Sequence, residues 1–262
     1  MVEFLNMILL AVVQGLTEFL PVSSSGHLVL FQTFLGTREG DVFFDIILHV
    51  GTLGSILVVY RREVRRLLAF DREARRYQMS LAAGTLPAVV VGLLFRSQIE
   101  DLFHSPLFAA GGLVFTAGIL FSTRFAAADH PLADPWEPRA PSVGRAFFIG
   151  FAQVFAILPG ISRSGTTIAA ALWAGLPRAE AARFSFLLSI PAVGGALALQ
   201  LMDGNSNGMA EWVRLVLAGL VAFGVGLAAI RWTALAVVQA HFWKFSIYCL
   251  LLGVAVLVIL SG

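Results

Sequence analysis

Apolar residues fill most of the chain in long runs that short polar stretches separate. A helix that crosses a bilayer needs about 20 predominantly apolar residues. Six runs are long enough for this: 42–60, 79–96, 106–123, 184–202, 212–231 and 243–261. The hydrophobic pattern therefore predicts six transmembrane helices.

Two further apolar segments, 2–20 and 145–158, run into Leu-Pro and then into stretches rich in Ser and Gly. Shorter apolar pieces follow them at 25–36 and 166–176. A hydrophobic segment interrupted in this way is typical of a re-entrant hairpin, because irregular backbone at membrane depth must be surrounded by protein or by a water-filled cavity. We therefore expect an all-α integral membrane fold with about six transmembrane helices and two re-entrant broken-helix hairpins.

The two interrupted segments resemble each other at an offset of about 139 residues. The sequences compared are QGLTEFLPVSSSGH (14–27) and QVFAILPGISRSGT (153–166). The matching pairs are Gln14 and Gln153, Ser23 and Ser162, Ser25 and Ser164, and Gly26 and Gly165. Three spans follow each segment, so the two halves should have opposite topology, with a site where they meet. We predict one membrane domain, 1–262, made of inverted repeats 1–125 and 140–262 and joined by a Pro-rich linker at 126–142.

Composition agrees with a membrane protein. Hydrophobic residues make up 58% of the chain and charged residues 13%, whereas soluble domains have about 45–50% and 25%. This excludes a soluble enzyme, a disordered protein and a nucleic-acid binder. The first segment carries Glu3 and Glu18 and has no basic start, so we read it as retained structure and not as a signal peptide.

The basic residues predict the orientation, because cytoplasmic loops are enriched in Lys and Arg. Most of them fall in loops on one side of the predicted topology: Arg61, Arg62, Arg65, Arg66, Arg72, Arg75, Arg76, Arg124, Arg139, Arg145, Arg178, Arg183, Arg231 and Lys244. The opposite loops hold only Arg38, Arg96 and Arg214. Both termini are therefore expected on the extracytoplasmic side.

Only two formal charges, Glu18 and Arg163, occur within the matched stretches 14–27 and 153–166. An ionisable group at bilayer depth costs about 2.5–3.5 kcal/mol on insertion scales, so it usually has a function and a partner. A functional pair at the meeting point of the repeats is the stronger interpretation. A purely structural ion pair between the repeats is the alternative.

The polar residues around these charges suit a phosphate. Turns that contain glycine and lead into a helix direct N–H groups toward an anion, and arginine adds a planar fork of donors. His27 adds a base or nucleophile. The candidate binding residues are Ser23, Ser24, Ser25 and Gly26 in the first turn, and Gly160, Ser162, Ser164, Gly165, Thr166 and Thr167 in the second. His49 lies in the span 42–60, where it either reaches the site or bonds a neighbouring helix.

These motifs resemble a known family. QGLTEFLPVSSSGH is similar to the Q/E-x-x-x-E segment and Ser/His loop of the undecaprenyl-pyrophosphate phosphatases, the bacitracin-resistance family. PGISRSGTT (159–167) is similar to that family's second loop. FDIILHVGTLGSILVV (44–59) and AARFSFLLSIP (181–191) also read like family members, so the resemblance covers nearly the whole chain.

The resemblance implies a bacterial inner-membrane phosphatase that removes the terminal phosphate of undecaprenyl pyrophosphate and recycles the lipid carrier of peptidoglycan synthesis. By position, Glu18, His27 and Arg163 match the family's catalytic residues, with Ser24, Ser162 and Thr167 in support. The family uses a divalent cation, Mg²⁺ or Ca²⁺. Gln14 stands where some members have Glu, so Glu18 and Gln14 are the expected metal ligands and the substrate's phosphates would supply others.

Two mechanisms and two functions stay open at this point. His27 attacks or acts as the general base, oriented by Glu18, or Ser24 attacks with His27 as its base. A lipid-phosphate transporter or flippase with the same anion site is the alternative to a phosphatase, because inverted repeats with broken helices are also a transporter plan. The expected partners are undecaprenyl pyrophosphate and membrane lipids, with no nucleic acid, and a homodimer stays open. The active site should open to the extracytoplasmic side.

Overall fold

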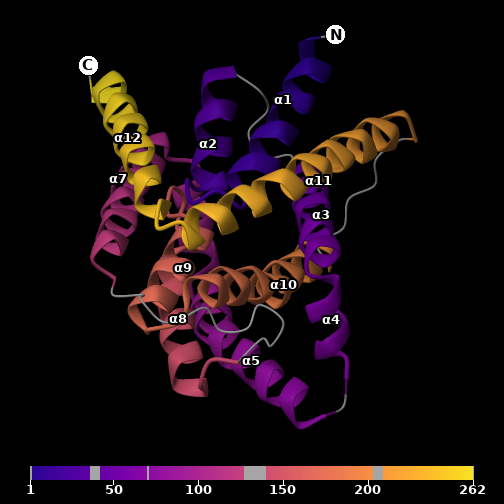
Figure 1. Ribbon diagram of the computed structural model, residues 1–262. Coiled ribbons are helices and arrows are strands. Elements are labelled where there is room, and N and C mark those ends of the chain that lie inside the picture. Colours follow the sequence, from indigo (N-terminus) through magenta and orange to yellow (C-terminus); the bar gives the residue numbers. More distant parts are fainter. Residues whose placement is uncertain (1, 36–41, 70, 127–139, 203–208, 262) are drawn as a thin grey trace.

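The computed structural model describes residues 2–35, 42–69, 71–126, 140–202 and 209–261, and every regular element within them is helical. This confirms the predicted all-α class (Figure 1). Arg38, Arg139 and most of the predicted linker (residues 127–139) lie outside the described residues. The described elements are α1 (Val2–Thr17), α2 (Ser24–Leu35), α3 (Val42–Val59), α4 (Arg61–Leu67), α5 (Arg72–Leu94), α6 (Arg96–Phe103), α7 (Pro106–Ser122), η1 (Thr123–Phe125), α8 (Val143–Phe155), α9 (Arg163–Trp173), α10 (Arg178–Met202), α11 (Met209–Val238), η2 (Phe242–Lys244) and α12 (Phe245–Ser261).

Several of these helices are long and apolar enough to cross a membrane. Within the described residues there are four such stretches: Arg72–Leu94, Pro106–Phe125, Trp212–Val238 and Phe242–Ser261. A fifth arises if Phe44–Val59 and Arg61–Leu67, which meet at 85°, count as one span. The predicted run 184–202 falls in α10, which is not one of these stretches. The chain is thus a multi-pass membrane protein, and the count of six spans stays a prediction.

Large apolar side chains cover the outside of these helices. Leu251, Val258 and Ile259 of α12 each expose more than half of their surface, and so do Val213 and Leu220 of α11. Exposed apolar surface of this extent marks a binding or membrane surface. In a helix of a membrane protein it is the surface that the lipid chains cover.

The two interrupted segments form two helix pairs with a break between them. Residues 18–23 separate α1 from α2, and residues 156–162 separate α8 from α9. A serine precedes each new helix, and its hydroxyl accepts a backbone N–H three residues later: Gly26 N donates to Ser23 Oγ at 3.2 Å and Gly165 N to Ser162 Oγ at 3.0 Å. Such a serine cap satisfies a donor that the helix start leaves unpaired. The matched caps explain why the two segments have similar sequences.

The breaks come together because small residues allow it. A Cβ added to Gly26 would lie 2.9 Å from the Cα atom of Gly160. Gly160 itself has a positive φ of 85°, a conformation that glycine adopts without steric cost. The turn before α9 therefore packs directly on the start of α2, backbone against backbone.

The packing of whole helices follows the exchange that an inverted repeat would produce. In this repeat α1 corresponds to α8, and α5 to α11. The structure packs α1 against α11 and α8 against α5. The second contact is therefore the counterpart of the first, with the two halves of the chain exchanged. The helix contacts agree with the predicted repeats 1–125 and 140–262, which remain a prediction.

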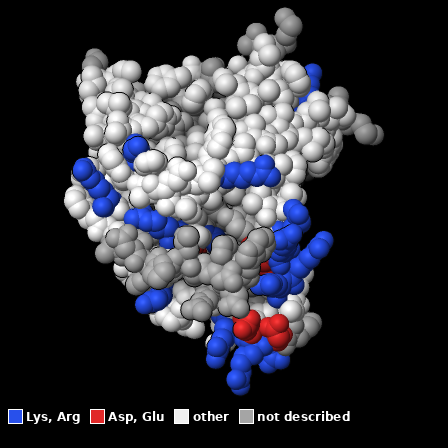
Figure 2. All heavy atoms as spheres, in the orientation of Figure 1, with Lys and Arg blue, Asp and Glu red and all other residues white. Residues whose placement is uncertain are grey.

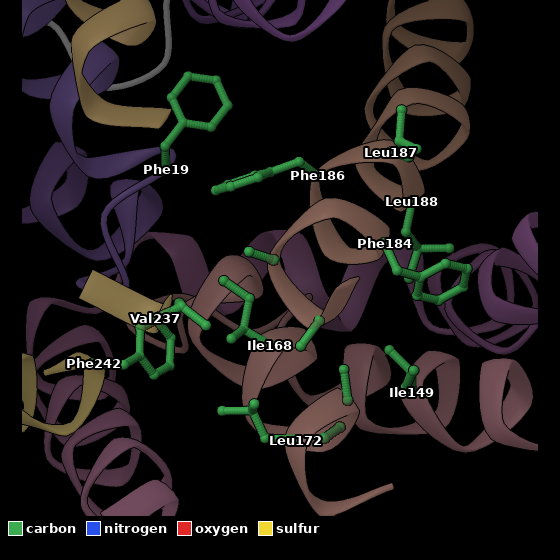
Figure 3. Packing of buried hydrophobic residues seen from close by; sticks show 14 of the residues in the cluster. Phe19, Ile149, Ile168, Leu172, Phe184, Phe186, Leu187, Leu188, Val237 and Phe242 are labelled. Carbon is green, nitrogen blue, oxygen red and sulfur yellow. The ribbon is translucent and has the colours of Figure 1, made fainter. Parts of the chain in front are cut away.

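An apolar cluster packs the first break and α9 against α10. Phe19, in the first break, points toward Phe186 of α10, and their ring centroids are 5.8 Å apart in an edge-to-face arrangement (Figure 3). Ile168 and Leu172 of α9 lie in the same cluster and are buried. Burial of such side chains stabilises a fold by about 1.5–3 kcal/mol each in water, and here it fixes α9 against α10.

Charged residues gather at one end of the molecule. The arginines of α4 and the first turns of α5 are exposed, and Figure 2 shows them over the lower half of this face, while most of the upper half is uncharged. The two chain ends lie at the top (Figure 1). The basic end and the ends of the chain therefore lie at opposite ends of the molecule in this view, and the side of the membrane on which each lies stays a prediction.

Candidate active site

The two charges of the interrupted segments form one ion pair. Glu18 follows the last residue of α1 and Arg163 is the first residue of α9. Arg163 Nη2 donates a hydrogen bond to Glu18 Oε1, and both side chains are largely buried. A buried charge requires such a partner, since its desolvation costs several kcal/mol. The structure thus joins the two breaks through the two residues that their charge singled out.

Glu18 is fixed by further donors. Gln14, one turn earlier on α1, donates from Nε2 to Glu18 Oε2 at 3.0 Å. Ser24, the first residue of α2, donates its hydroxyl to the same Oε2 at 2.7 Å. These bonds hold one carboxylate oxygen toward Arg163 and the other toward Ser24. Glu18 is therefore the centre of the polar cluster.

A cavity of about 160 Å³ opens over this cluster. Glu18, Ser23, Ser24, Ser25, Ser162 and Arg163 line it, and apolar side chains such as Phe103, Ile157, Ile161 and Val193 complete its wall. Pockets of this kind, with a few convergent polar groups in an apolar surround, are the usual form of small-molecule sites. Six of the predicted site residues therefore face one cavity.

Thr116 of α7 holds the turn before α9 in place through two hydrogen bonds. The Thr116 hydroxyl donates to the carbonyl of Gly160 at 2.9 Å and accepts the N–H of Ser162 at 3.0 Å. This single hydroxyl fixes both ends of the turn that carries Arg163. Nothing in the motif itself indicates Thr116, because it lies 44 residues before Gly160 in another helix.

The remaining predicted binding residues support the cavity without lining it. Thr167 bonds the carbonyl of Arg163 at 2.8 Å and lies 2.6 Å from the hydroxyl of Ser185 on α10. Ser164 donates to the carbonyl of Leu20 in the first break at 3.3 Å. The others off the cavity wall are Gln14, Gly160, Gly165 and Thr166. Their part as direct substrate ligands stays a prediction.

His27 is buried and does not line the cavity. Its Nδ1 lies 2.8 Å from the carbonyl of Ser23, which can only accept, so Nδ1 carries the proton. Its Nε2 lies 2.7 Å from the hydroxyl of Tyr248 on α12, and the two rings are stacked. Both ring nitrogens are thus engaged, and the ring bridges α2 and α12. The catalytic role predicted for His27 remains untested.

His49 of α3 does reach the cavity. Its Nδ1 donates to the carbonyl of Asp45 at 2.8 Å, and its Nε2 lies 3.9 Å from Glu18 Oε2. About a third of the side chain is exposed, and it lines the cavity beside Glu18. Of the two readings for this histidine, the structure supports the one in which it faces the site.

The residues present fit a cation that is held mainly by its substrate. Within the part of the chain that the structure describes, no group of three His, Cys, Asp or Glu side chains could hold a metal ion. The buried Oε1 of Gln14, beside Glu18, has no hydrogen-bond partner there. One carboxylate and one amide oxygen suit Mg²⁺ or Ca²⁺, which prefer oxygen ligands, and Mg²⁺ usually keeps waters and phosphate oxygens as the others.

Comparison of the sequence with known proteins identifies the family of this chain. The family described as Bacitracin resistance protein BacA matches residues 7–255. An undecaprenyl-diphosphatase of Desulfatibacillum aliphaticivorans is 40% identical over 279 residues, which cover 98% of each chain. One of Korarchaeum cryptofilum is 38% identical, over 98% of this chain and 100% of its own. One of Rhodopirellula baltica is 40% identical over 99% of each chain.

Proposed function

Because the chain belongs to the bacitracin resistance protein BacA family, we propose that it is an undecaprenyl-diphosphatase. It hydrolyses undecaprenyl pyrophosphate to undecaprenyl phosphate and inorganic phosphate, and so recycles the lipid carrier used in cell-wall synthesis. The observation that carries this function is the arrangement around Glu18, which bonds Arg163 on one oxygen and Ser24 on the other. An anion-binding group and a hydroxyl whose proton is already directed to a base thus meet in one cavity.

Arg163 and the start of α9 bind the terminal phosphoryl group. Arg163 Nη1 is buried and has no hydrogen-bond partner among the described residues, so it is available to a phosphoryl oxygen. The N-terminal end of α9 adds the positive partial charge of the helix dipole. Preorganised donors of this kind stabilise the charge that spreads over the phosphoryl oxygens in the transition state.

Ser24 is the nucleophile that the geometry favours. Its oxygen attacks the terminal phosphorus, its proton passes to Glu18 Oε2, and the bond between phosphorus and the bridging oxygen breaks to release the lipid monophosphate. Water then attacks the phosphoserine and loses a proton to bulk solvent, the bond between phosphorus and the Ser24 oxygen breaks to release inorganic phosphate, and Ser24 regains its proton from Glu18. The 2.7 Å bond from Ser24 to Glu18 supports this route, whereas His27 has both ring nitrogens engaged elsewhere.

A divalent cation belongs to this proposal. When it is bound, it neutralises the pyrophosphate and makes the lipid monophosphate a better leaving group. Glu18 and Gln14 Oε1 are the protein oxygens that would hold it.

The proposed orientation places the arginines of α4 and α5 in the cytoplasm and both termini outside the inner membrane. The positive-inside rule and the separation of the basic end from the chain ends support it. The site then takes its substrate from the extracytoplasmic side. The carrier alternative is not favoured, because binding alone does not need a hydroxyl bonded to a buried carboxylate.

The test of the function is phosphate release from undecaprenyl pyrophosphate by the purified protein in detergent, with and without a chelator. We expect release that depends on a divalent cation. Absence of any release under conditions in which the protein stays folded would refute the phosphatase. Transport of the lipid across vesicles without release would favour the carrier.

A further inference from the structure

An apolar groove of about 470 Å³ runs along α7 next to the site cavity. Leu107, Phe108, Gly111, Gly112 and Phe115 line it from α7. Ser105 in front of the helix and Ile161 from the turn before α9 complete the lining. Its volume is in the range of about 300–1,000 Å³ that is usual for small-molecule sites.

The groove continues from the site cavity. Ile161 lines both spaces and is two residues from Arg163. Phe115, at the groove, lies 6.5 Å from Phe155 at the end of α8, measured between ring centroids. The groove is therefore lined by α7 and by the turn that carries Arg163, with the end of α8 in contact with Phe115.

The lining of the groove suits hydrocarbon. It contains no charged residue, and its one polar side chain, Ser105, already accepts the N–H of Phe108 at 3.2 Å as the helix cap. Leu107 and Phe115 expose about half of their surface, 55% and 50%. A hydrocarbon chain placed here would bury this surface and leave no polar group unpaired.

Two adjacent glycines give the groove its shape. A Cβ at Gly112 would lie 2.4 Å from the carbonyl oxygen of Pro159, so this position lets α7 approach the turn closely. A Cβ at Gly111 would meet nothing within 4 Å, so a side chain here would extend into the groove. Gly111 therefore keeps space open beside the site without being required by the packing.

We propose that this groove binds the part of the prenyl chain next to the pyrophosphate. The inference rests on the proposed function and adds where the lipid lies: the phosphates occupy the polar cavity, the chain passes Ile161, and its first isoprene units lie along α7. Beyond the groove the chain continues into the bilayer. The groove thus holds the hydrocarbon that is attached directly to the pyrophosphate.

The experiment compares Gly111→Leu with Gly118→Leu, which lies two turns further along α7, is exposed and also has nothing within 4 Å of an added Cβ. The substrate is farnesyl pyrophosphate, and inorganic pyrophosphate serves as a competitive inhibitor without a chain. We expect Gly111→Leu to raise the KM of farnesyl pyrophosphate about tenfold, as for the lost burial of a few methylene groups, and to leave the Ki of inorganic pyrophosphate unchanged. An unchanged KM, or an equal rise in both constants, would overturn the proposal.

Chemical labelling provides a measurement independent of turnover. Cys249 is buried, so Gly111→Cys and Gly118→Cys each place one accessible thiol on α7. Farnesyl pyrophosphate should slow the reaction of N-ethylmaleimide with the first thiol and not with the second, and inorganic pyrophosphate should slow neither. If added phospholipid protects the first thiol and farnesyl pyrophosphate does not, the groove holds an acyl chain and the proposal is wrong.

The two proposals fail in different ways. A wild-type protein that releases no phosphate from undecaprenyl pyrophosphate would contradict the phosphatase. Normal release with equal kinetics and equal labelling at positions 111 and 118 would contradict the groove alone.

Discussion

Glu18 and Arg163 are 145 residues apart in the sequence, yet Arg163 Nη2 donates directly to Glu18 Oε1. The contact joins the ends of two broken helices in the apolar interior. Since each of these helices would otherwise leave a charge unpaired in the membrane, the pair is both a structural link and the polar centre of the site.

Removing either partner should affect stability and activity together. A buried charge left without its partner costs about 3–5 kcal/mol, and loss of a transition-state donor costs about 10²–10³-fold in kcat. We expect Glu18→Gln and Arg163→Ala each to lower the melting temperature and to reduce phosphate release at least about 10²-fold. The measurements are thermal unfolding in detergent and kcat on undecaprenyl pyrophosphate.

A double-mutant cycle distinguishes the contribution of the ion pair from the separate contributions of Glu18 and Arg163. Glu18→Gln with Arg163→Ala removes both charges, so the double variant should regain part of the stability that the single variants lose. It should regain no activity. Recovery of activity in the double variant would contradict a chemical role for both residues and leave a purely structural ion pair.

The sequence pointed to this pair because so few charges occur in the interrupted segments. It named His49 but left open whether His49 reaches the site or bonds a neighbouring helix, since the face that α3 turns toward Glu18 depends on how α3 packs between α10 and α11. It could not show that Nε2 of His27 meets Tyr248, 221 residues away. The hydrophobic runs gave the helices, but the sharp bend after Val59 depends on tertiary packing.

Ser24→Ala should abolish turnover while the protein keeps its fold. The substitution removes the hydroxyl that donates to Glu18 at 2.7 Å, and with it the proposed nucleophile. We expect a loss of at least about 10²-fold in kcat, the lower range for proton-transfer catalysis, with farnesyl pyrophosphate still bound. The matched control is Ser25→Ala. Ser25 lines the same cavity, but its hydroxyl pairs with the hydroxyl of Ser23, at 3.3 Å, and not with Glu18.

A substrate labelled in the terminal phosphate tests the covalent step of that prediction. Rapid quenching in acid should trap label on the wild-type protein and none on Ser24→Ala. Label at a histidine would establish His27 or His49 as the nucleophile instead.

Alanine substitutions of His27 and His49 should have different effects on stability and activity. His27→Ala removes a ring that bridges α2 and α12, so we expect a lower melting temperature and a kcat of the folded protein within about threefold of wild type. His49→Ala removes a cavity residue beside Glu18, so we expect little change in melting temperature and a fall of about tenfold in kcat/KM, the size of one hydrogen bond to a charged group. Tyr248→Phe, which removes only the hydroxyl bonded to His27, should reproduce the effect of His27→Ala in part. A loss of about 10²-fold or more in kcat for His27→Ala at unchanged stability would restore His27 as the general base.

Gln14→Glu should make the protein more dependent on its cation. The new carboxylate would lie within one turn of Glu18, where two like charges repel unless a cation lies between them. We expect the melting temperature to fall in chelator and to return when Mg²⁺ is added, with half-maximal activity at a lower Mg²⁺ concentration than wild type. Wild-type protein should show a smaller shift in melting temperature. Equal shifts in both would place the cation elsewhere.

Thr116→Val should loosen the turn that carries Arg163. The Thr116 hydroxyl bonds Gly160 O and Ser162 N at once, and valine keeps the shape but leaves both buried groups unpaired, at about 1–3 kcal/mol each. We therefore expect a lower melting temperature and a fall of about tenfold in kcat, because Arg163 is no longer held in one position. Thr116→Ser keeps the hydroxyl and should retain both properties. If Thr116→Val lost stability while its kcat equalled that of Thr116→Ser, the turn would not need this support to bind and transfer the phosphoryl group.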